Sequence, residues 1–263
     1  RMTRYRRRVL AACLGLLLLS GCGSPASPSP SPSALPGASI NDIDGDGRVD
    51  VVYLNGTDSE DDDPETDDVW ISRVVIVYAS GRTQKFSRNE IGRSGRDGFS
   101  DLVVANLNGD AYADLVIGSE GHVLLAYGSA AGIDGSHVQD ITLPEAGLTS
   151  LAVVPRPSPL VVVGNMGATV DGHEAAGAVT VFPVDAAGRA GEGVRLVQGS
   201  PGIPGAPGDQ DDFGYAVAAS GSTLVVGAPG ETLDGRRVGS VTLLHRTGLT
   251  SFTGQAFDPA SPG

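Results

Sequence analysis

The sequence predicts an all-β protein built from repeated short sheets, and three observations support this class. Glycine is abundant, with 38 residues, and aromatic side chains make up only 5% of the chain, which suits short strands joined by many turns. No long amphipathic helical pattern follows residue 22. A run of small and β-branched apolar residues recurs four times, at residues 51–54, 115–118, 161–164 and 224–227.

Each recurring strand is followed by a partner and then by a fainter outer strand. The expected partners are residues 74–78, 123–127, 178–182 and 240–244, and the outer strands are 84–86, 140–143, 194–197 and 255–257. A small-residue strand precedes the last three recurring strands, at 102–105, 151–154 and 216–219. Four strands in about 45–65 residues are typical of a β-propeller blade. We therefore expect about four four-stranded units, approximately at 40–91, 92–146, 147–208 and 209–263, with strands buried on both faces because their apolar runs are nearly continuous.

Acidic residues precede the first recurring strand with the spacing of a calcium loop. Oxygen side chains occupy positions 1, 3, 5 and 9 of residues 42–50, namely Asp42, Asp44, Asp46 and Asp50. Arg48 would add its backbone carbonyl, because Ca²⁺ takes about 6–8 oxygen ligands from carboxylates, carbonyls and water. An EF-hand would need a following helix and a Glu at the twelfth position, where this chain has Tyr53. The pattern predicts a Ca²⁺ loop that leads into a strand.

The same spacing occurs once more, directly before residues 115–118. Here the side-chain ligands would be Asn106, Asn108, Asp110 and Asp114, with the backbone carbonyl of Tyr112. Two amides replace carboxylates, and Ala111 replaces the glycine at position 6. We expect this second loop to bind Ca²⁺ more weakly, since affinity follows ligand charge and loop geometry.

Charge and cysteine usage limit the partners. The net charge of −13 argues against binding of the folded part to nucleic acid or to anionic lipid surfaces. The only two cysteines, Cys13 and Cys22, lie near the N-terminus, so the body of the protein has neither a disulfide nor thiol chemistry. A secreted chain without disulfides needs another source of stabilisation, and bound calcium is the candidate.

The N-terminal region has the organisation of an export signal. Residues 1–21 combine a basic segment with an apolar segment of signal-peptide length. The sequence Leu19-Ser20-Gly21-Cys22 resembles the lipobox of bacterial lipoproteins, which implies that Cys22 is lipidated and anchors the chain to the outer face of the bacterial membrane. A plain secretory signal with an incidental cysteine is the alternative. Residues 22–39 then form a Pro/Ser-rich extended linker.

Two short motifs in the last unit carry a family resemblance. Phe213-Gly214 opens that unit, and Gly227-Ala228-Pro229 follows its second strand. These motifs resemble the FG-GAP repeat, whose blades form the integrin alpha-subunit propeller. The resemblance covers residues 40–263 and implies calcium between the first and second strands of a blade. It also implies seven blades, so we expect an incomplete propeller, left as an open arc or closed by self-association.

The expected function is that of a surface-anchored, calcium-stabilised module that binds an unknown protein or glycan ligand in cell adhesion. We do not expect an enzyme, because the chain has no Gly-x-Ser-x-Gly elbow and no phosphate loop. Its four histidines, His122, His137, His173 and His245, are scattered. The alternatives are the scaffold of a secreted enzyme acting on surface polymers and a truncated, non-functional product. A carboxylate pair or a Ser–His pair converging outside the two loops would favour the enzyme.

Overall fold

The computed structural model describes residues 41–57, 71–87, 98–119, 121–143, 145, 147, 150–155 and 157–259. The chain divides into two units, Arg1–Ser33 and Ala34–Gly263, and all described residues belong to the second. The expected signal peptide, Cys22 and the linker to residue 39 lie outside the described residues. Within the described ranges, no helix has the length and apolar character needed to cross a membrane.

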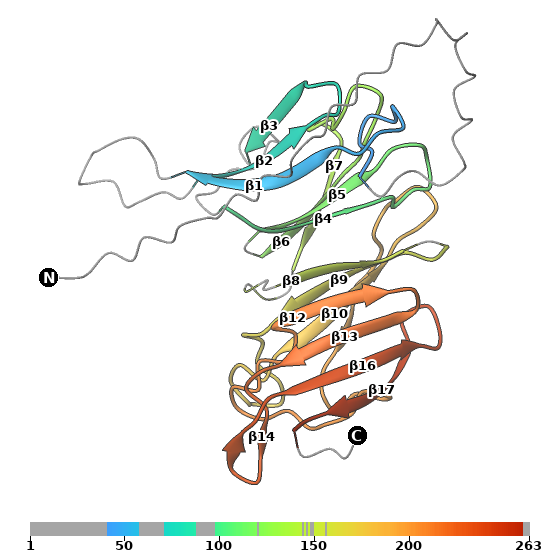
Figure 1. Ribbon diagram of the computed structural model, residues 1–263. Helices are drawn as coiled ribbons and strands as arrows, with labels where there is room; N and C mark the ends of the chain where they lie inside the picture. Colours follow the sequence, from blue (N-terminus) through green and yellow to red (C-terminus); the bar gives the residue numbers. More distant parts are fainter. Residues whose placement is uncertain are drawn as a thin grey trace, which may run out of the picture. The chain divides into compact units, whose positions relative to one another are not determined.

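The described chain forms four main sheets in which neighbouring strands are antiparallel (Figure 1). The first sheet contains β1 (Val51–Thr57), β2 (Ile71–Val77) and β3 (Thr83–Ser87). The second contains β4 (Phe99–Ala105), β5 (Asp114–Ser119), β6 (His122–Ala126) and β7 (Val138–Thr142). The third contains β8 (Ser150–Val154), β9 (Leu160–Asn165), β10 (Ala178–Pro183) and β11 (Val194–Leu196).

The fourth sheet has one addition that the sequence analysis missed. Its main strands are β12 (Ala216–Ser220), β13 (Thr223–Ala228), β16 (Ser240–Arg246) and β17 (Phe252–Phe257). Between β13 and β16 the chain forms a small hairpin, β14 (Thr232–Leu233) and β15 (Arg236–Arg237). Asp234 and Gly235 form its turn at φ of 51° and 74°, which is the geometry of the two-residue turn that Asp-Gly favours.

The four-stranded pattern holds for three of the four sheets. In each of these, a small-residue strand lies at one edge and the recurring apolar strand lies beside it. The first sheet has three strands in its described part, because β1 corresponds to the second strand of the other sheets and the residues before Asn41 are outside the description. The sheets are consistent with FG-GAP blades, while closure into a ring is not observed among the described strands.

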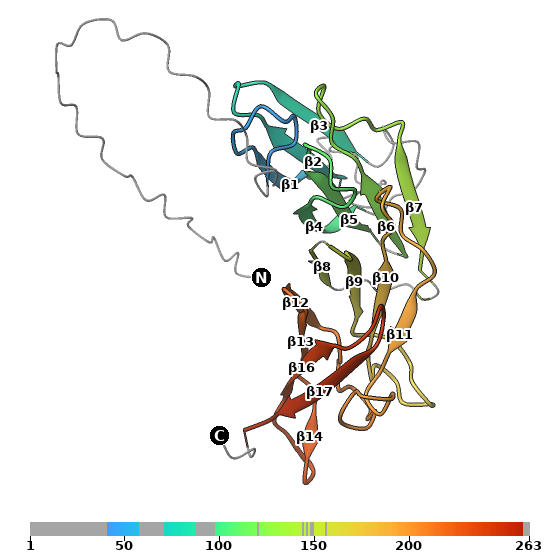
Figure 2. The ribbon, with the colours of Figure 1, turned by 90° about the vertical axis from the view of Figure 1, so that its right-hand side faces the viewer.

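Successive sheets pack face to face through three apolar layers. The small-residue edge strands lie next to one another, with contacts from β4 to β8 and from β8 to β12, and β1 contacts β4 (Figure 2). The first layer includes Val74, Ile76, Leu115, Ile117 and Leu124. The second includes Val116, Val123, Leu125, Val161, Val163 and Phe182. The third includes Val162, Val179, Val181, Leu224, Val226 and Leu244.

The alternation of side chains explains why the middle sheets are so apolar. Leu115 and Ile117 of β5 face the first sheet, whereas Val116 between them faces the third, because successive side chains of a strand point to opposite faces. Every residue of β5 is buried. The prediction of burial on both faces is wrong for β1, whose Val51 and Tyr53 are exposed because no described sheet covers that face. It is also wrong for β13, whose residues alternate between half-buried and buried. The reason is that no described sheet covers the outer face of the fourth sheet.

The joint between the third and fourth sheets depends on Phe213-Gly214. Phe213 is fully buried in the third apolar layer, and its backbone N–H donates to the Ala176 carbonyl at 3.0 Å. Gly214 donates to the Gly227 carbonyl at 3.0 Å and lies so close to the third sheet that a Cβ would be 2.4 Å from the carbonyl oxygen of Ala178. With a φ of +92°, this position favours glycine both by backbone conformation and by space.

A Gly214→Ala substitution tests this joint, with Gly172→Ala as the control. Both glycines have a positive φ near 90°, but a Cβ on Gly172 would have nothing within 4 Å. Both variants should therefore bear the same backbone strain, and only Gly214→Ala should add a clash, on the order of 2 kcal/mol further destabilisation. Urea unfolding of both variants measures the difference, and equal losses of stability would contradict the close-approach explanation.

Candidate metal centre

The loop of residues 42–50 is organised by the carboxylate of Asp42. Its Oδ1 accepts the backbone N–H groups of Gly45 and Asp46 at 2.8 and 3.1 Å, and its Oδ2 accepts that of Gly47 at 2.8 Å. Gly45 and Gly47 have φ of 73° and 82°, so glycine provides the tight curvature. The chain thus wraps around a buried carboxylate before it enters β1.

The last acidic residue of each loop has the same structural role. The Asp50 carboxylate accepts the N–H groups of Ile43 at 2.8 Å and Ala79 at 2.9 Å. Asp114 accepts those of Leu107 at 2.8 Å and Gly128 at 3.0 Å. In each case one carboxylate oxygen closes the loop and the other binds the turn that follows the next strand of the same sheet, β2 or β6. Both aspartates are buried. The equal spacing in sequence therefore corresponds to equal geometry.

Three carboxylates of the first loop converge. Asp42, Asp44 and Asp50 each place one oxygen within 4.8 Å of the others. The Oδ1 atom of Asp44 is buried and has no hydrogen-bond partner among the residues that the structure describes. Such an arrangement is costly for a charged oxygen unless a cation is near. Oxygen donors of this kind suit hard cations such as Ca²⁺. The cluster, together with this unpartnered oxygen, fits a bound metal ion.

The remaining predicted ligands of the first loop lie outside this cluster. Asp46 is exposed, and its Oδ1 accepts the Arg48 N–H at 2.8 Å. Arg48 is exposed as well. In the described geometry, then, Asp42, Asp44 and Asp50 are brought together, and Asp46 and Arg48 shape the open side of the loop.

The second loop is held together by its own amides. Asn106 Nδ2 donates to the Asp110 carbonyl and Asn108 Nδ2 donates to Asp110 Oδ2, each at 2.7 Å. Asp110 Oδ1 accepts the Tyr112 N–H at 2.8 Å. The Asn side chains therefore donate hydrogen bonds to Asp110 and its backbone, which offsets charge at that residue without a cation.

The two loops lie against each other. Ala113 N–H donates to the Asp42 carbonyl at 2.7 Å, and a Cβ on Gly45 would be 2.6 Å from the Tyr112 ring. Because β1 and β5 begin directly after the loops and their sheets pack together, both loops lie at the same end of the sheets. A change in the first loop therefore bears directly on the second.

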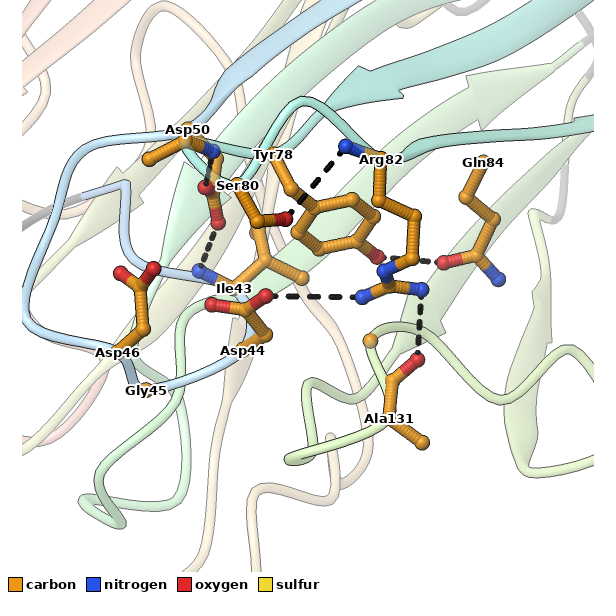
Figure 3. A network of polar contacts seen from close by, with 12 residues as sticks. Ile43, Asp44, Gly45, Asp46, Asp50, Tyr78, Ser80, Arg82, Gln84 and Ala131 are labelled. Carbon is orange, nitrogen blue, oxygen red and sulfur yellow. Dashed lines mark hydrogen bonds and ion pairs between the residues drawn. The ribbon is translucent and has the colours of Figure 1, made fainter.

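Arg82 and Tyr78 are site residues that the sequence analysis did not identify. Arg82 Nη2 lies 3.6 Å from Asp44 Oδ2, and the guanidinium stacks 3.6 Å from the centroid of the Tyr78 ring (Figure 3). No spacing rule places a residue from the β2–β3 turn beside a loop almost 40 positions earlier. The only sequence signal for Arg82 was an arginine directly after the expected turn between the strands that became β2 and β3.

The histidines have more carboxylate neighbours than expected. His122 pairs with Asp140 at 2.8 Å, His137 with Asp134 at 2.6 Å and His173 with Asp209 at 3.1 Å. Three of the four histidines, although scattered in the sequence, therefore each lie beside a carboxylate.

One of these pairs also includes a serine, Ser136, whose Oγ lies 3.2 Å from His137 Nδ1. Asp134 contacts the same Nδ1 atom, whereas a catalytic relay uses the two different ring nitrogens. The group is an exposed turn, and its geometry does not activate the serine.

An open groove is lined by the β8–β9 and β12–β13 connections and by the turn that follows β16. Pro157, Ser158, Ser222 and Arg246 are among its lining residues, and no Asp, Glu, His or Cys lines it. Arg246 is committed to backbone carbonyls, with Nη1 donating to Ser158 at 2.5 Å and Nη2 to Leu249 at 2.6 Å. The groove thus offers no acid–base group for chemistry.

These features define a class: a β-repeat protein whose sheets pack face to face and whose two acidic loops lie together at one end of the sheets. Within that class, the chain contains an FG-GAP repeat, since this family matches residues 205–243. The match includes Phe213-Gly214 and Gly227-Ala228-Pro229 and confirms the resemblance drawn from those motifs. No curated protein matches the chain. The Asp42, Asp44 and Asp50 cluster lies outside the matched repeat.

Asp114 predicts a pH dependence of stability. Burial raises the pKa of its carboxyl from 3.8 to about 6, although backbone N–H groups act in the opposite direction. The folded state then binds a proton more tightly than the unfolded state. In EDTA, lowering the pH from about 7 to about 5 should therefore add roughly 1 kcal/mol to the free energy of unfolding through this residue.

Urea unfolding of the wild type and of Asp114→Asn at each pH measures this contribution. The variant should lack it, and the exposed Asp185→Asn variant should keep it. Identical pH dependence in the wild type and Asp114→Asn would show that the Asp114 carboxyl does not titrate in this range.

Proposed function

We propose that this FG-GAP repeat protein is a calcium-stabilised binding module displayed outside a bacterial cell, and that it is not an enzyme. The observation that carries the proposal is the cluster of Asp42, Asp44 and Asp50 with its unpartnered oxygen. A cation there would offset repulsion among three close carboxylates. Its role would be structural, to fix the end of the sheets from which the loops project.

Ca²⁺ is the ion that best suits this loop. Asp42, Asp44 and Asp50 would supply carboxylate oxygens, and Asp46 and the Arg48 carbonyl lie on the open side where the loop can close on an ion. The second loop, residues 106–114, is the weaker candidate because its Asn amides already satisfy Asp110. FG-GAP repeats often bind calcium, which agrees with the assignment.

The binding role follows from what the described residues offer. The loops at the metal end are exposed and are positioned by rigid sheets, which is the usual arrangement of recognition loops. The Ser136–His137 turn and the groove beside Arg246 lack the geometry of a catalytic centre. A protein or glycan ligand, recognised through these loops, is the partner that we propose.

Calcium dependence tests the metal site. Calcium at about 100 times its Kd should raise the free energy of unfolding of the full-length protein by about 2.7 kcal/mol, and EDTA should reverse the gain. Asp44→Asn keeps the shape of the side chain but removes one converging charge, so it should lose most of this response. Calorimetric melting with and without EDTA provides the measurement.

Asp185→Asn, which removes an exposed charge in another turn, is the matched control and should respond as the wild type does. Equal calcium responses in Asp44→Asn and the wild type would exclude the cluster as the site. Retention of the full-length protein on arrayed proteins and glycans tests the binding role. It should depend on calcium, and the absence of retention in every condition would contradict the proposed role.

The membrane anchor makes a separate prediction at Cys22. If this cysteine carries the lipid, Cys22→Ser should move the protein from the membrane fraction to the soluble fraction, because the acyl chains provide the anchoring energy. Cys13→Ser, which changes the other cysteine, should leave the protein in the membrane fraction. Fractionation with immunoblotting distinguishes the two, and continued anchoring of Cys22→Ser would defeat the lipoprotein assignment.

A further inference from the structure

Arg82 is held in place from three sides. It follows the turn that joins β2 to β3, where Gly81 N–H donates to the Tyr78 carbonyl at 2.8 Å and Tyr78 N–H donates to the Arg82 carbonyl at 2.9 Å. Its guanidinium lies on the Tyr78 ring, and Nη1 donates to the Ala131 carbonyl at 3.0 Å (Figure 3). A stacked and hydrogen-bonded guanidinium is a fixed positive charge.

That fixed charge lies beside the carboxylate cluster. Nη2 of Arg82 is 3.6 Å from Asp44 Oδ2, while Asp44 Oδ1 is buried and unpartnered. The arginine thus neutralises one side of Asp44 and leaves the other oxygen available to an ion. Arg48, the cationic residue within the loop itself, is exposed.

Arg82 also connects the loop to the second sheet. Ala131 lies in the β6–β7 connection, and Gln84 of β3 binds the same connection through the Ile133 carbonyl at 2.6 Å and the Ile133 N–H at 3.2 Å. The Tyr78 hydroxyl donates to Gln84 Oε1 at 2.5 Å. The residues that position Arg82 are therefore those that join the first two sheets.

We propose that Arg82 is a built-in counter-cation of the 42–50 loop: it stabilises the loop when calcium is absent and lowers the calcium affinity. This inference rests on the proposed metal site. When calcium is scarce, the guanidinium offsets part of the repulsion among the carboxylates. When calcium binds at the unpartnered oxygen of Asp44, the Arg82 guanidinium repels the ion, because its contacts with Tyr78 and Ala131 hold it in place. The loop thereby keeps its fold over a wider range of calcium concentration.

The proposal has a signature that a purely structural role would not produce. Arg82→Gln should bind calcium more tightly, by about tenfold at low salt, because a nearby unit charge repels a divalent ion. The same variant should melt at a lower temperature in EDTA, so the temperature gained on adding calcium becomes larger. The gain in affinity should shrink at high salt, because solvent ions screen the half-exposed guanidinium.

The experiment compares four full-length proteins by calcium titration calorimetry and by melting in EDTA and in calcium. Arg236→Gln is the control, since it removes the same charge from an exposed position of the β14–β15 hairpin outside both loops, and its calcium affinity should stay near that of the wild type. Arg82→Lys keeps the charge, so its calcium affinity should stay near that of the wild type even if the loss of stacking lowers its melting temperature. Circular dichroism confirms that each variant is folded.

The outcomes separate this inference from the metal site itself. If the wild type binds calcium and Arg82→Gln does not bind it more tightly, the role of Arg82 is overturned and the metal site stands. The same conclusion follows if Arg82→Gln lowers the melting temperature equally in EDTA and in calcium. An equal gain in calcium affinity in Arg236→Gln would overturn the role of Arg82 as well. No calcium binding by the wild type or by Arg82→Gln would overturn both the metal site and this inference. Binding detected only in Arg82→Gln would support the inference and show that Arg82 suppresses the site.

Discussion

The face-to-face packing of apolar sheets is the interaction on which the rest of this structure depends. A sheet such as β4–β7 is apolar on both faces, so it is stable only between two neighbours. Leu115 and Val116 are adjacent in β5 but belong to different layers. The need for close contact then explains Gly214, where a side chain would separate the third and fourth sheets. Apolar burial has to supply this cohesion, because the described body of the chain has no cysteine.

Loop placement follows from that packing. The strands β1 and β5 correspond to each other, because each begins where an acidic loop ends and pairs with the strand that follows it in sequence. When the sheets pack, the loops are brought together, and the bond from Ala113 N–H to the Asp42 carbonyl joins them directly. Asp50 and Asp114 then hold each loop to the turn of its own sheet. The carboxylates of Asp50 and Asp114 therefore fix the backbone at this end of the sheets without a bound ligand.

The two loops show two ways of balancing the charge of a carboxylate turn. In the second loop, Asn106 and Asn108 replace aspartates and donate hydrogen bonds to Asp110 and its backbone. In the first loop, backbone N–H groups bind Asp42 and Asp50, and the guanidinium of Arg82 binds Asp44. The buried oxygen of Asp44 that remains unpartnered is the point at which the proposed cation would complete the balance. The loops share their closing hydrogen bonds and a positive φ at Gly45 and Gly109, but they differ in side-chain chemistry and at position 6, where only Gly47 has a positive φ.

The sequence by itself determined the strand pattern, the repeat motifs and the two loops. Each of these depends on near neighbours: alternating or continuous apolar runs, Phe213-Gly214, and oxygens spaced within nine positions. It also located Asp42, Asp44 and Asp50, whose convergence depends on the curvature of a short loop.

Only the tertiary structure decided which faces are buried, that Asp46 stays outside the carboxylate cluster, and which arginine lies beside that cluster. Val225 and Val161 belong to similar apolar runs, but only Val161 has a neighbouring sheet on its side. Asp46 has the spacing of a ligand but is exposed and lies outside the cluster. Arg82 reaches Asp44 because the β2–β3 turn packs beside the loop and because Tyr78 and Ala131 from two sheets hold it there. The physical reason is that local spacing constrains a short segment, whereas burial and charge pairing depend on which distant segments pack against it.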